Sequence, residues 1–574
     1  MKLSLIVALV LAITACTPTA SGEAKYEITT DSIYNHIAVL AHDSLEGRRV
    51  GYEGEIKAAK YIYNIMSTAG LEPKGDSSTF LQSFIFTKKI EYGEANSLTL
   101  NGEQLELKSE FLPMRQSASI VFDFTGIVDV GYGITVDSSE GDYDDYAGVD
   151  TEGKAVIVRR FAPETTDSTQ PDLDRYSSLT NKISNALDHK AAAVFFVTPP
   201  DHDDTLRGGG PVRVSPKEIP IVFLRRAGLE RLGLDIDSPD ISSLTGEVDI
   251  YKIRDTGYNV VGYIPTANDT TVIFGAHYDH LGWGGPGSGS RYLGEEPMIH
   301  NGADDNGSGT AALLELARYF ADRKREIKYS MLFIAFSGEE FGVLGSSHYA
   351  RHMTIDSSKV RMMINMDMIG RLAEQDKGLA IMGTGTCPEF KIYLDSLDVT
   401  DLKLALKESG MGPSDHASFY NRGIPVLNFF TGAHEDYHKP EDDIEKLDCD
   451  GIVRVASLVA DITSHFDRFD GPLTFQKTKT PEGMSARSNF SVTLGIMPDF
   501  ISEVNGLGVD GVSPDRPGER AGLIEGDVII KMGDIKIGDI YDYMNALGKF
   551  RKGDTTSVAV VRLLDTLQME VIFE

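Results

Sequence analysis

The chain is poor in cysteine, and what little it has cannot organise the fold. Of its 574 residues only three are cysteines, namely Cys16, Cys387 and Cys449. Cys16 lies in the N-terminal leader-like stretch, so Cys387 and Cys449 could form one bridge at most. A disulfide framework is therefore excluded as the basis of the fold. One bridge and two buried thiols both remain compatible with the sequence.

The chain also has a deficit of positive charge. It contains 55 Lys and Arg against 86 Asp and Glu, which gives a formal net charge of −31. This balance argues against nucleic acid and against an anionic membrane surface as electrostatic partners. Tandem repeats and low-complexity tracts are also missing. A hydrophobic content of 41% and the length indicate a globular protein with three or more domains.

A short apolar run, Leu3 to Ile13, follows Lys2 at the N-terminus. It is too short for a permanent membrane span and predicts a secretory signal over residues 1–15. Ile13-Thr14-Ala15-Cys16 resembles a bacterial lipobox, which implies lipidation of Cys16 and anchoring to a membrane of the cell envelope, on its periplasmic face or at the cell surface. Residues 16–24 would form a tether. The alternative is a plain signal peptide with an incidental cysteine.

The middle of the chain shows the pattern of an α/β sheet. Thr271 to Ala276 and Tyr329 to Phe336 are apolar, β-rich and almost uncharged, as strands covered on both faces should be. Between them, Thr310 to Tyr319 has apolar residues at helical spacing. The order strand, loop, helix, strand predicts ligand binding at the carboxyl ends of the strands. Further strands are expected at Asn259–Ile264, Val360–Met368, Leu379–Met382 and Ile424–Phe430, and a long helix at Ile452–Phe466.

Histidines and carboxylates gather where these strands end. His277 and Asp279 are two residues apart, which places both on one face of a strand. Because a metal-bound imidazole usually donates its other N–H to a carboxylate, Asp279 is placed to orient His277. The other residues of metal-ligand type at strand ends or in adjoining loops are Asp305, Glu339, Glu340, Asp367 and His438. Carboxylates gathered this closely would repel one another without cations, so the set predicts a metal site.

Charge counting favours two divalent ions. Asp305, Glu340 and Asp367, together with a bridging hydroxide, carry four negative charges, which two Zn²⁺ ions would neutralise. Histidine and carboxylate ligands without thiolates fit catalytic zinc, although the sequence leaves manganese and cobalt open. The remaining acid, Glu339, can point over the bound water as a general base while its neighbour Glu340 binds metal.

Five motifs resemble the M28 family of zinc aminopeptidases in order and spacing. They are H-Y-D, G-A-D-D-N-G-S-G, S-G-E-E, N-M-D-M-I-G and Y-H-K-P-E-D-D, which begin at residues 277, 302, 337, 365 and 437. The resemblance implies an α/β fold with a doubly wound mixed sheet and two zinc ions per chain. It implies His277 and Asp367 on one zinc, Glu340 and His438 on the other, and Asp305 bridging both.

The same resemblance implies the catalytic roles. Glu339 matches the general base, Asp279 the buried acid behind the histidine, and Tyr437 a tyrosine that stabilises the oxyanion in some members. The implied reaction is hydrolysis of N-terminal residues from peptides by a zinc-bridging hydroxide. The complete ligand set counts against the metal-free receptor branch and the single-zinc glutaminyl cyclases of the superfamily. Asp415-His416 resembles a segment near the substrate pocket and is assigned no metal.

Residues 25–110 and 251–470 together are expected to form the peptidase domain. The β-rich segment 111–250 reads as an insert, and its stretches Asp145 to Val158 and Lys190 to Val197 resemble a protease-associated (PA) domain. Such an insert would either shape access to the active site or serve as a packing module.

Residues 471–487 are expected to form a linker, because they are polar and contain Pro and Gly. Residues 488–574 resemble a PDZ domain of the bacterial protease type, on the evidence of Thr493 to Ile496, Ser513-Pro514 and Arg520 to Ile529. A PDZ-like domain would receive the C-terminus of a peptide by β-augmentation, or play a structural role.

The sequence thus predicts a dizinc exopeptidase, with aminopeptidase activity favoured by the resemblance. One alternative is a zinc carboxypeptidase of the same superfamily, which would need cationic residues aimed at the substrate carboxylate, and none could be placed. The other is a non-catalytic cell-surface protein that binds peptides through its PA-like and PDZ-like modules. The complete ligand set and Glu339 speak against this third possibility.

Overall fold

The computed structural model describes residues 25–573 apart from some short segments. These segments are 139–140, 164–172, 205–217, 236–239, 286–287, 293, 295, 375–377, 398, 400–401, 479–491, 500–505, 513–515, 525, 538–542, 544–545, 548, 551 and 563–564. The expected signal sequence, Cys16 and its tether lie outside the described residues. Among the helices that are described, none combines the length and apolar character needed to cross a membrane.

The largest sheet has nine strands in the order β1-β14-β16-β15-β17-β20-β18-β19, with β2 also paired to β14. β15 pairs in parallel with β16 and β17, whereas β14 runs antiparallel to β16, so the sheet is mixed as expected. Its strands are β1 (Glu72–Pro73), β2 (Leu81–Tyr92), β14 (Ile250–Ile264), β15 (Thr271–His277), β16 (Ser330–Phe336), β17 (Val360–Met366), β18 (Gly378–Met382), β19 (Lys403–Lys407) and β20 (Val426–Phe430).

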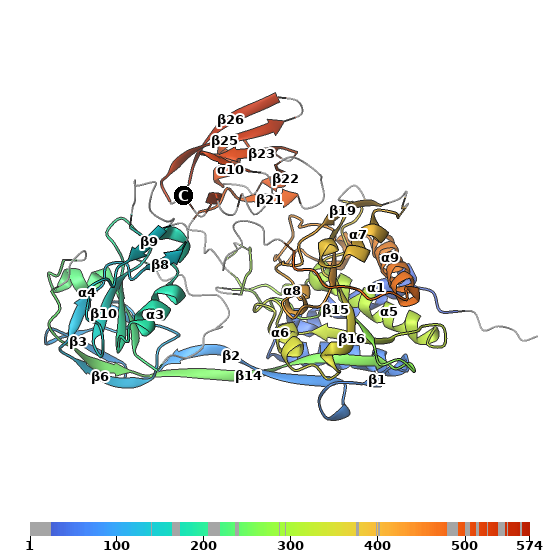
Figure 1. The fold of residues 1–574 in the computed structure, drawn as a ribbon, viewed down its shortest axis with the longest axis horizontal. Coiled ribbons are helices and arrows are strands. Elements are labelled where there is room, and N and C mark those ends of the chain that lie inside the picture. Colours follow the sequence, from blue (N-terminus) through green and yellow to red (C-terminus); the bar gives the residue numbers. More distant parts are fainter. Residues whose placement is uncertain are drawn as a thin grey trace, which may run out of the picture.

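Helices cover both faces of this sheet, which is why β15 and β16 are buried along their whole length. One face packs against the apolar sides of α1 (Thr30–Leu40), α2 (Glu53–Thr68), α5 (Gly309–Asp322), α7 (Pro388–Leu394) and α9 (Cys449–Arg468). The other face packs against α6 (Leu344–Arg351) and α8 (His416–Tyr420). Figure 1 shows α1, α5 and α9 on one side of the sheet and α6 and α8 on the other.

A second, β-rich unit contains a five-stranded sheet, β5-β12-β11-β10-β7, and a four-stranded sheet, β4-β3-β13-β6. Apolar residues from both sheets share one core. The strands are β3 (Ser97–Leu100), β4 (Glu103–Leu105), β5 (Phe111–Pro113), β6 (Ile120–Phe124), β7 (Ile127–Asp129), β10 (Ala155–Arg159), β11 (Ala193–Val197), β12 (Ile221–Leu224) and β13 (Leu244–Val248). A hairpin, β8 (Thr135–Ser138) with β9 (Gly141–Asp144), and the helices α3 (Leu179–Asp188) and α4 (Arg226–Arg231) complete the unit.

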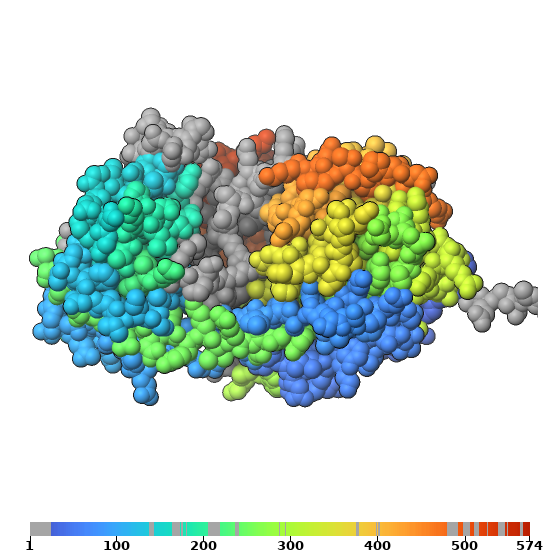
Figure 2. Space-filling view, turned by 60° about the horizontal axis from the view of Figure 1, so that its bottom comes forward, coloured from blue at the N-terminus to red at the C-terminus, as the bar shows by residue number. Residues whose placement is uncertain are grey.

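The expected boundary between residues 110 and 111 is wrong. β3 pairs with β13, and β4 pairs with β3, so residues 97–105 belong to the sheet of the insert and not to the unit built around the nine-stranded sheet. The two units are joined by β2 and β14, which pair from Leu81↔Val260 to Tyr92↔Ile250 as one antiparallel ribbon. Figure 1 shows this ribbon running between the units, and Figure 2 shows it as a strip of blue and green surface.

The C-terminal unit is a six-stranded sheet with its own apolar core. Its elements are β21 (Ile496–Asp499), β22 (Leu507–Val512), α10 (Pro517–Ala521), β23 (Val528–Met532), β24 (Ile535–Lys536), β25 (Thr555–Arg562) and β26 (Asp565–Ile572). Among the described strands, β21 pairs with β22 alone and forms an edge of the sheet. Ser513-Pro514, one of the stretches that resemble a PDZ domain, lies outside the described residues.

The first part of the expected linker packs on the unit built around the nine-stranded sheet. The Phe475 ring lies 5.5 Å from the Tyr420 ring, and the Gln476 backbone N–H donates to the Thr386 carbonyl. Residues 471–478 are therefore part of the domain surface rather than a free connection. The two remaining cysteines, Cys387 and Cys449, are both free thiols.

Candidate metal centre

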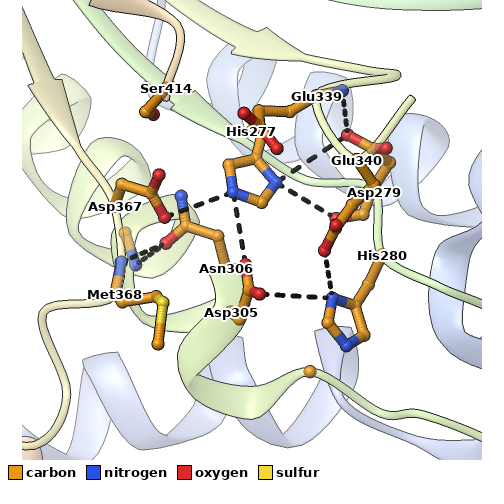
Figure 3. A network of polar contacts seen from close by, with 12 residues as sticks. His277, Asp279, His280, Asp305, Asn306, Glu339, Glu340, Asp367, Met368 and Ser414 are labelled. Atoms are coloured by element: carbon orange, nitrogen blue, oxygen red, sulfur yellow. Dashed lines mark hydrogen bonds and ion pairs between the residues drawn. The ribbon is translucent and has the colours of Figure 1, made fainter. Parts of the chain in front are cut away.

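The metal-type ligands come together at one edge of the main sheet, as the sequence predicts. β15 ends at His277, Asp367 follows the last residue of β17, and Glu340 lies four residues after β16 ends. Asp305 stands in the tight turn of residues 303–308 that leads into α5. Because β15, β16 and β17 run parallel, their carboxyl ends meet at the same edge, and Figure 3 shows the resulting cluster.

His277, Asp305 and Asp367 form the first group of ligand atoms. The Nε2 atom of His277 lies 3.3 Å from Asp305 Oδ1 and 3.2 Å from Asp367 Oδ1. A tetrahedral zinc shell with bonds of ~2.0–2.1 Å has its ligand atoms about 3.3 Å apart. The three side chains are therefore spaced as the ligands of one ion would be.

Glu340, His438 and the second oxygen of Asp305 form the other group. His438 Nε2 lies 3.3 Å from Asp305 Oδ2 and 3.1 Å from Glu340 Oε2. Asp305 thus presents one carboxylate oxygen to each group, which is the arrangement that a bridging ligand requires. Two ions sharing one carboxylate fit the five residues that the sequence singled out.

The far ring nitrogens of both histidines face backbone carbonyls. His438 Nδ1 lies 2.9 Å from the Gly289 carbonyl oxygen, and His277 Nδ1 lies 3.2 Å from the carbonyl oxygen of Asp279. Protonation at Nδ1 leaves Nε2 free to bind metal, and Nε2 is the atom that points at the carboxylates in each case. Metal-bound histidines in proteins are commonly oriented in this way.

The expected relation between His277 and Asp279 differs in its details. β15 ends at His277, so Asp279 is not on the strand, and its carboxylate lies 3.8 Å from His277 Nδ1, farther than its own carbonyl. Asp279 Oδ1 instead accepts a hydrogen bond of 3.0 Å from the Glu339 backbone N–H. Asp279 therefore ties the loop of His277 to the loop of Glu339.

His280 is the residue of the centre that the sequence analysis left without a role. Its Nδ1 atom lies 2.7 Å from Glu340 Oε1 and 3.8 Å from Asp305 Oδ2, and His280, Asp305 and Glu340 each offer a ligand atom within 4.8 Å of the others. His438 Nε2 lies within 3.3 Å of an oxygen of each carboxylate, so its two contacts are more even than those of His280. We interpret His280 as a donor to the outer oxygen of Glu340. In the sequence, His280 is marked only by its place directly after the H-Y-D motif.

The carboxylates control the protonation of the two ligand histidines. Burial alone would lower the pKa of His277, but the charge of Asp367 and the contact with Asp305 outweigh it and raise that pKa well above its usual value. In the same way, Glu340 and Asp305 overcome burial and raise the pKa of His438 to about 11. The cluster thus attracts positive charge strongly, and divalent cations are suited to supply it.

Glu339 differs sharply from its neighbour Glu340. Burial and the nearby acids Asp415, Glu340 and Asp367 raise the pKa of Glu339 well above that of an ordinary glutamate, although the charge of His277 acts in the opposite direction. For Glu340, burial is outweighed by His438 and by the contact with His280, and the pKa falls to about 2. Glu340 therefore favours its ionised form, whereas Glu339 has the higher proton affinity of the two.

Tyr437 lies beside the second group, with its ring stacked on His438 at a centroid distance of 3.8 Å. Burial and the charges of Asp305 and Glu340 raise the pKa of Tyr437 well above that of free tyrosine. The hydroxyl therefore stays protonated at neutral pH and can act as a hydrogen-bond donor.

Two polar side chains hold the ligand loops together. Asn306 donates from Nδ2 to the Met366 carbonyl and accepts at Oδ1 from the Met368 backbone N–H, so it clamps the backbone on both sides of Asp367. Asp442 accepts hydrogen bonds from the backbone N–H groups of Asp304 and Asp305. These contacts join residues 60 and more positions apart and could not be read from the sequence.

Comparison with known proteins agrees with the motifs. Residues 259–463, from within β14 almost to the end of α9, match the model of peptidase family M28. The chain is 35% identical over 227 residues to aminopeptidase YwaD of Bacillus subtilis, which covers 36% of this chain and 43% of the relative. It is 24% identical over 432 residues to the probable lipoprotein aminopeptidase LpqL of Mycobacterium tuberculosis, covering 71% of this chain and 75% of the relative.

These relatives are matched over only part of their length. The chain spans about half the length of the first curated relatives it matches, with 43% for YwaD and 55% for a probable leucine aminopeptidase of Trichophyton verrucosum. Among solved structures, an aminopeptidase from Aneurinibacillus sp. strain AM-1 is similar with a TM-score of 0.45 and 23% identity, over 79% of this chain and 97% of that chain.

Proposed function

We propose that the protein is a zinc-dependent aminopeptidase that binds two zinc ions. The single observation that carries this proposal is the pair of ligand groups that share Asp305, with His277 and Asp367 on one side and Glu340 and His438 on the other. The match of residues 259–463 to peptidase family M28 and the names of the relatives support it. When bound, the two ions supply Lewis-acid activation of water and polarisation of the scissile carbonyl.

The side chains around the ligands have the properties that peptide hydrolysis needs. Glu339 would take a proton from the attacking water and later pass it to the leaving amine, a transfer that its raised pKa favours. Tyr437, protonated at neutral pH, would donate a hydrogen bond to the developing oxyanion. Asp279 would keep the loops of His277 and Glu339 in register through its bond to the Glu339 backbone.

The finer parts of the proposal concern location and the two additional units. A lipid anchor on Cys16 would hold the enzyme at the bacterial cell envelope, and the name of the relative LpqL supports this. The insert would act as a PA-like module that either shapes access to the active site or serves as a packing module. The C-terminal unit would act as a PDZ-like domain, with edge strand β21 open to an extended peptide C-terminus.

Two substrates that differ only at the amino terminus test the activity. The purified protein should hydrolyse an amino-acid p-nitroanilide and should fail to hydrolyse its N-acetylated form. Removal of metal with a chelator should abolish the activity, and addition of Zn²⁺ should restore it. Equal rates on both substrates would contradict an aminopeptidase, and peptide binding without any turnover would favour the non-catalytic peptide-binding alternative.

A further inference from the structure

Two fully buried ionisable side chains of the N-terminal segment, those of Arg48 and Glu55, contact the loops that carry the candidate metal ligands. Arg48 ends the short 3-10 helix η1 (Asp43–Arg48), and Glu55 lies in the first turn of α2; both side chains are 0% exposed. Neither residue falls within the segment 259–463 that matches the peptidase family. In Figure 3 the pale blue ribbon of the N-terminal region lies behind the ligands.

Arg48 donates hydrogen bonds to four backbone carbonyls. Nε donates to the Tyr278 carbonyl over 2.6 Å, Nη2 to that of Gly302 over 2.9 Å, and Nη1 to those of Asn301 over 2.6 Å and Leu40. Tyr278 is the residue between His277 and Asp279. Asn301 and Gly302 begin the turn that carries Asp305.

The shape of the guanidinium explains why an arginine is needed at this position. Its five N–H donors form a rigid planar fork, which can satisfy several carbonyls in different directions at once. Lysine has three donors on a single atom and cannot span the same set. The backbone at Arg48 is left-handed, with φ of 49°, a conformation that is costly for a residue with a side chain and that persists only where its surroundings impose it.

Glu55 forms similar contacts with the loop that carries Glu339. Its Oε1 atom accepts from Ser337 Oγ at 2.6 Å and from the Tyr258 backbone N–H at 3.0 Å, and its Oε2 accepts from the Gly51 backbone N–H at 2.6 Å. The Tyr278 hydroxyl lies 3.4 Å from Oε1. Ser337 stands two residues before Glu339, so Glu55 fixes the base of that loop.

We propose that Arg48 and Glu55 are positioning residues of the metal centre, which hold the backbone of the loops that carry His277, Asp305 and Glu339. Neither touches substrate or metal, and each acts through the loop it holds. This inference rests on the proposed function, because it assumes that those loops bind zinc. On this proposal, a working centre requires residues outside the segment 259–463 that matches the peptidase family.

Four variants of the full-length protein test the proposal, with zinc affinity as the main readout. Arg48→Met removes charge and donors, Arg48→Lys keeps the charge, and Glu55→Gln keeps the shape. Arg323→Met is the matched control, because Arg323 also donates to backbone carbonyls, those of Tyr26 and Tyr319. The zinc dissociation constant is measured by competition with a chromophoric chelator, and kcat and KM on an amino-acid p-nitroanilide.

Both Arg48 variants should raise the zinc dissociation constant by about 10–100-fold, the usual effect of losing an outer partner of a metal site. Glu55→Gln should lower kcat by at least about 10-fold with little change in KM, because it disturbs the loop of the general base. Arg323→Met should leave zinc affinity and kcat unchanged, whatever its effect on the melting temperature. If both Arg48 variants prove unfolded by circular dichroism, the kcat of Glu55→Gln decides.

Three results would overturn the proposal. The first is wild-type zinc affinity in both Arg48 variants. The second is wild-type zinc affinity in Arg48→Lys alone, which would show that the charge of Arg48 matters and its hydrogen-bond geometry does not. The third is a loss of zinc affinity in Arg323→Met equal to that in the Arg48 variants. A wild-type protein that binds zinc but hydrolyses no p-nitroanilide would refute the proposed function, while the zinc affinities would still test the positioning role.

Discussion

Glu339 and Glu340 are neighbours in the sequence, yet the structure gives them different surroundings, and replacing each by glutamine should separate their roles. Glu340 Oε2 lies 3.1 Å from His438 Nε2, and its side chain is 4% exposed, so it belongs to the second ligand group. Glu339 is anchored through its backbone N–H on Asp279 and has the raised pKa. Glu340 is expected to bind metal, and Glu339 is expected to transfer a proton.

Glu339→Gln keeps the size of the side chain and removes its ability to accept a proton. The value of kcat should fall by about 10²–10⁴-fold, the usual contribution of a general base. The zinc content should stay at two ions per chain, because none of the donor atoms in the two groups is altered.

Glu340→Gln removes an anionic ligand from the second group. Loss of an outer-shell partner already weakens metal binding by about 10–100-fold, so loss of the ligand itself should exceed that range. After dialysis this variant should retain about one zinc ion, held by His277, Asp305 and Asp367, and should be inactive for that reason.

Elemental analysis of dialysed protein and hydrolysis of an amino-acid p-nitroanilide measure both quantities on the same samples. The reasoning is refuted if Glu339→Gln retains the wild-type kcat. It is also refuted if the pattern is reversed, so that Glu339→Gln has lost zinc while Glu340→Gln still holds two ions.

Three further predictions follow from single contacts. Tyr437→Phe should lower kcat by about 10²–10³-fold without loss of zinc, as removal of an oxyanion donor does, and an unchanged kcat in steady-state assays would exclude that role. Despite burial, hydrogen bonds from His36, Ser32 and Tyr26 lower the pKa of Glu315 to about 2 from 4.5. Its ionised form therefore contributes about 3 kcal/mol of stability above pH 4.5, and this contribution is lost as the pH falls toward 2. In urea unfolding, the stability of Glu315→Gln should depend less on acid pH than that of the wild type, and an identical pH dependence would contradict this. Leu316→Ala in the fully buried face of α5 should cost about 2–5 kcal/mol in the free energy of unfolding, and a loss below 1 kcal/mol in the same assay would show that the site is poorly packed.

Strand positions and ligand clusters were the predictable part of the molecule. The uncharged runs that became β15 and β16 can be recognised locally, and parallel strands necessarily bring their carboxyl ends to one edge. For this reason His277 and Asp367, 90 residues apart, could be expected to meet before any coordinates were known.

The parts that sequence reasoning missed depend on contacts without a local signature. The pairing of β3 with β13 joins residues far apart in the chain and moves the edge of the insert, because a short strand carries no mark of the sheet it will join. Arg48 contacts Tyr278 and Gly302, which are more than 200 residues away in the sequence, and the sequence around Arg48 does not predict these contacts. The sequence shows a histidine at position 280, but its role could be inferred only from its distance to Glu340 in the structure.

Diffraction data collected at the zinc absorption edge from crystals grown with zinc would test the dizinc centre most directly. Two anomalous peaks are expected, one bounded by His277 and Asp367 and the other by Glu340 and His438, with an Asp305 oxygen bound to each. A single peak, or a second ion bound by His280 while His438 stays free, would contradict the proposed arrangement.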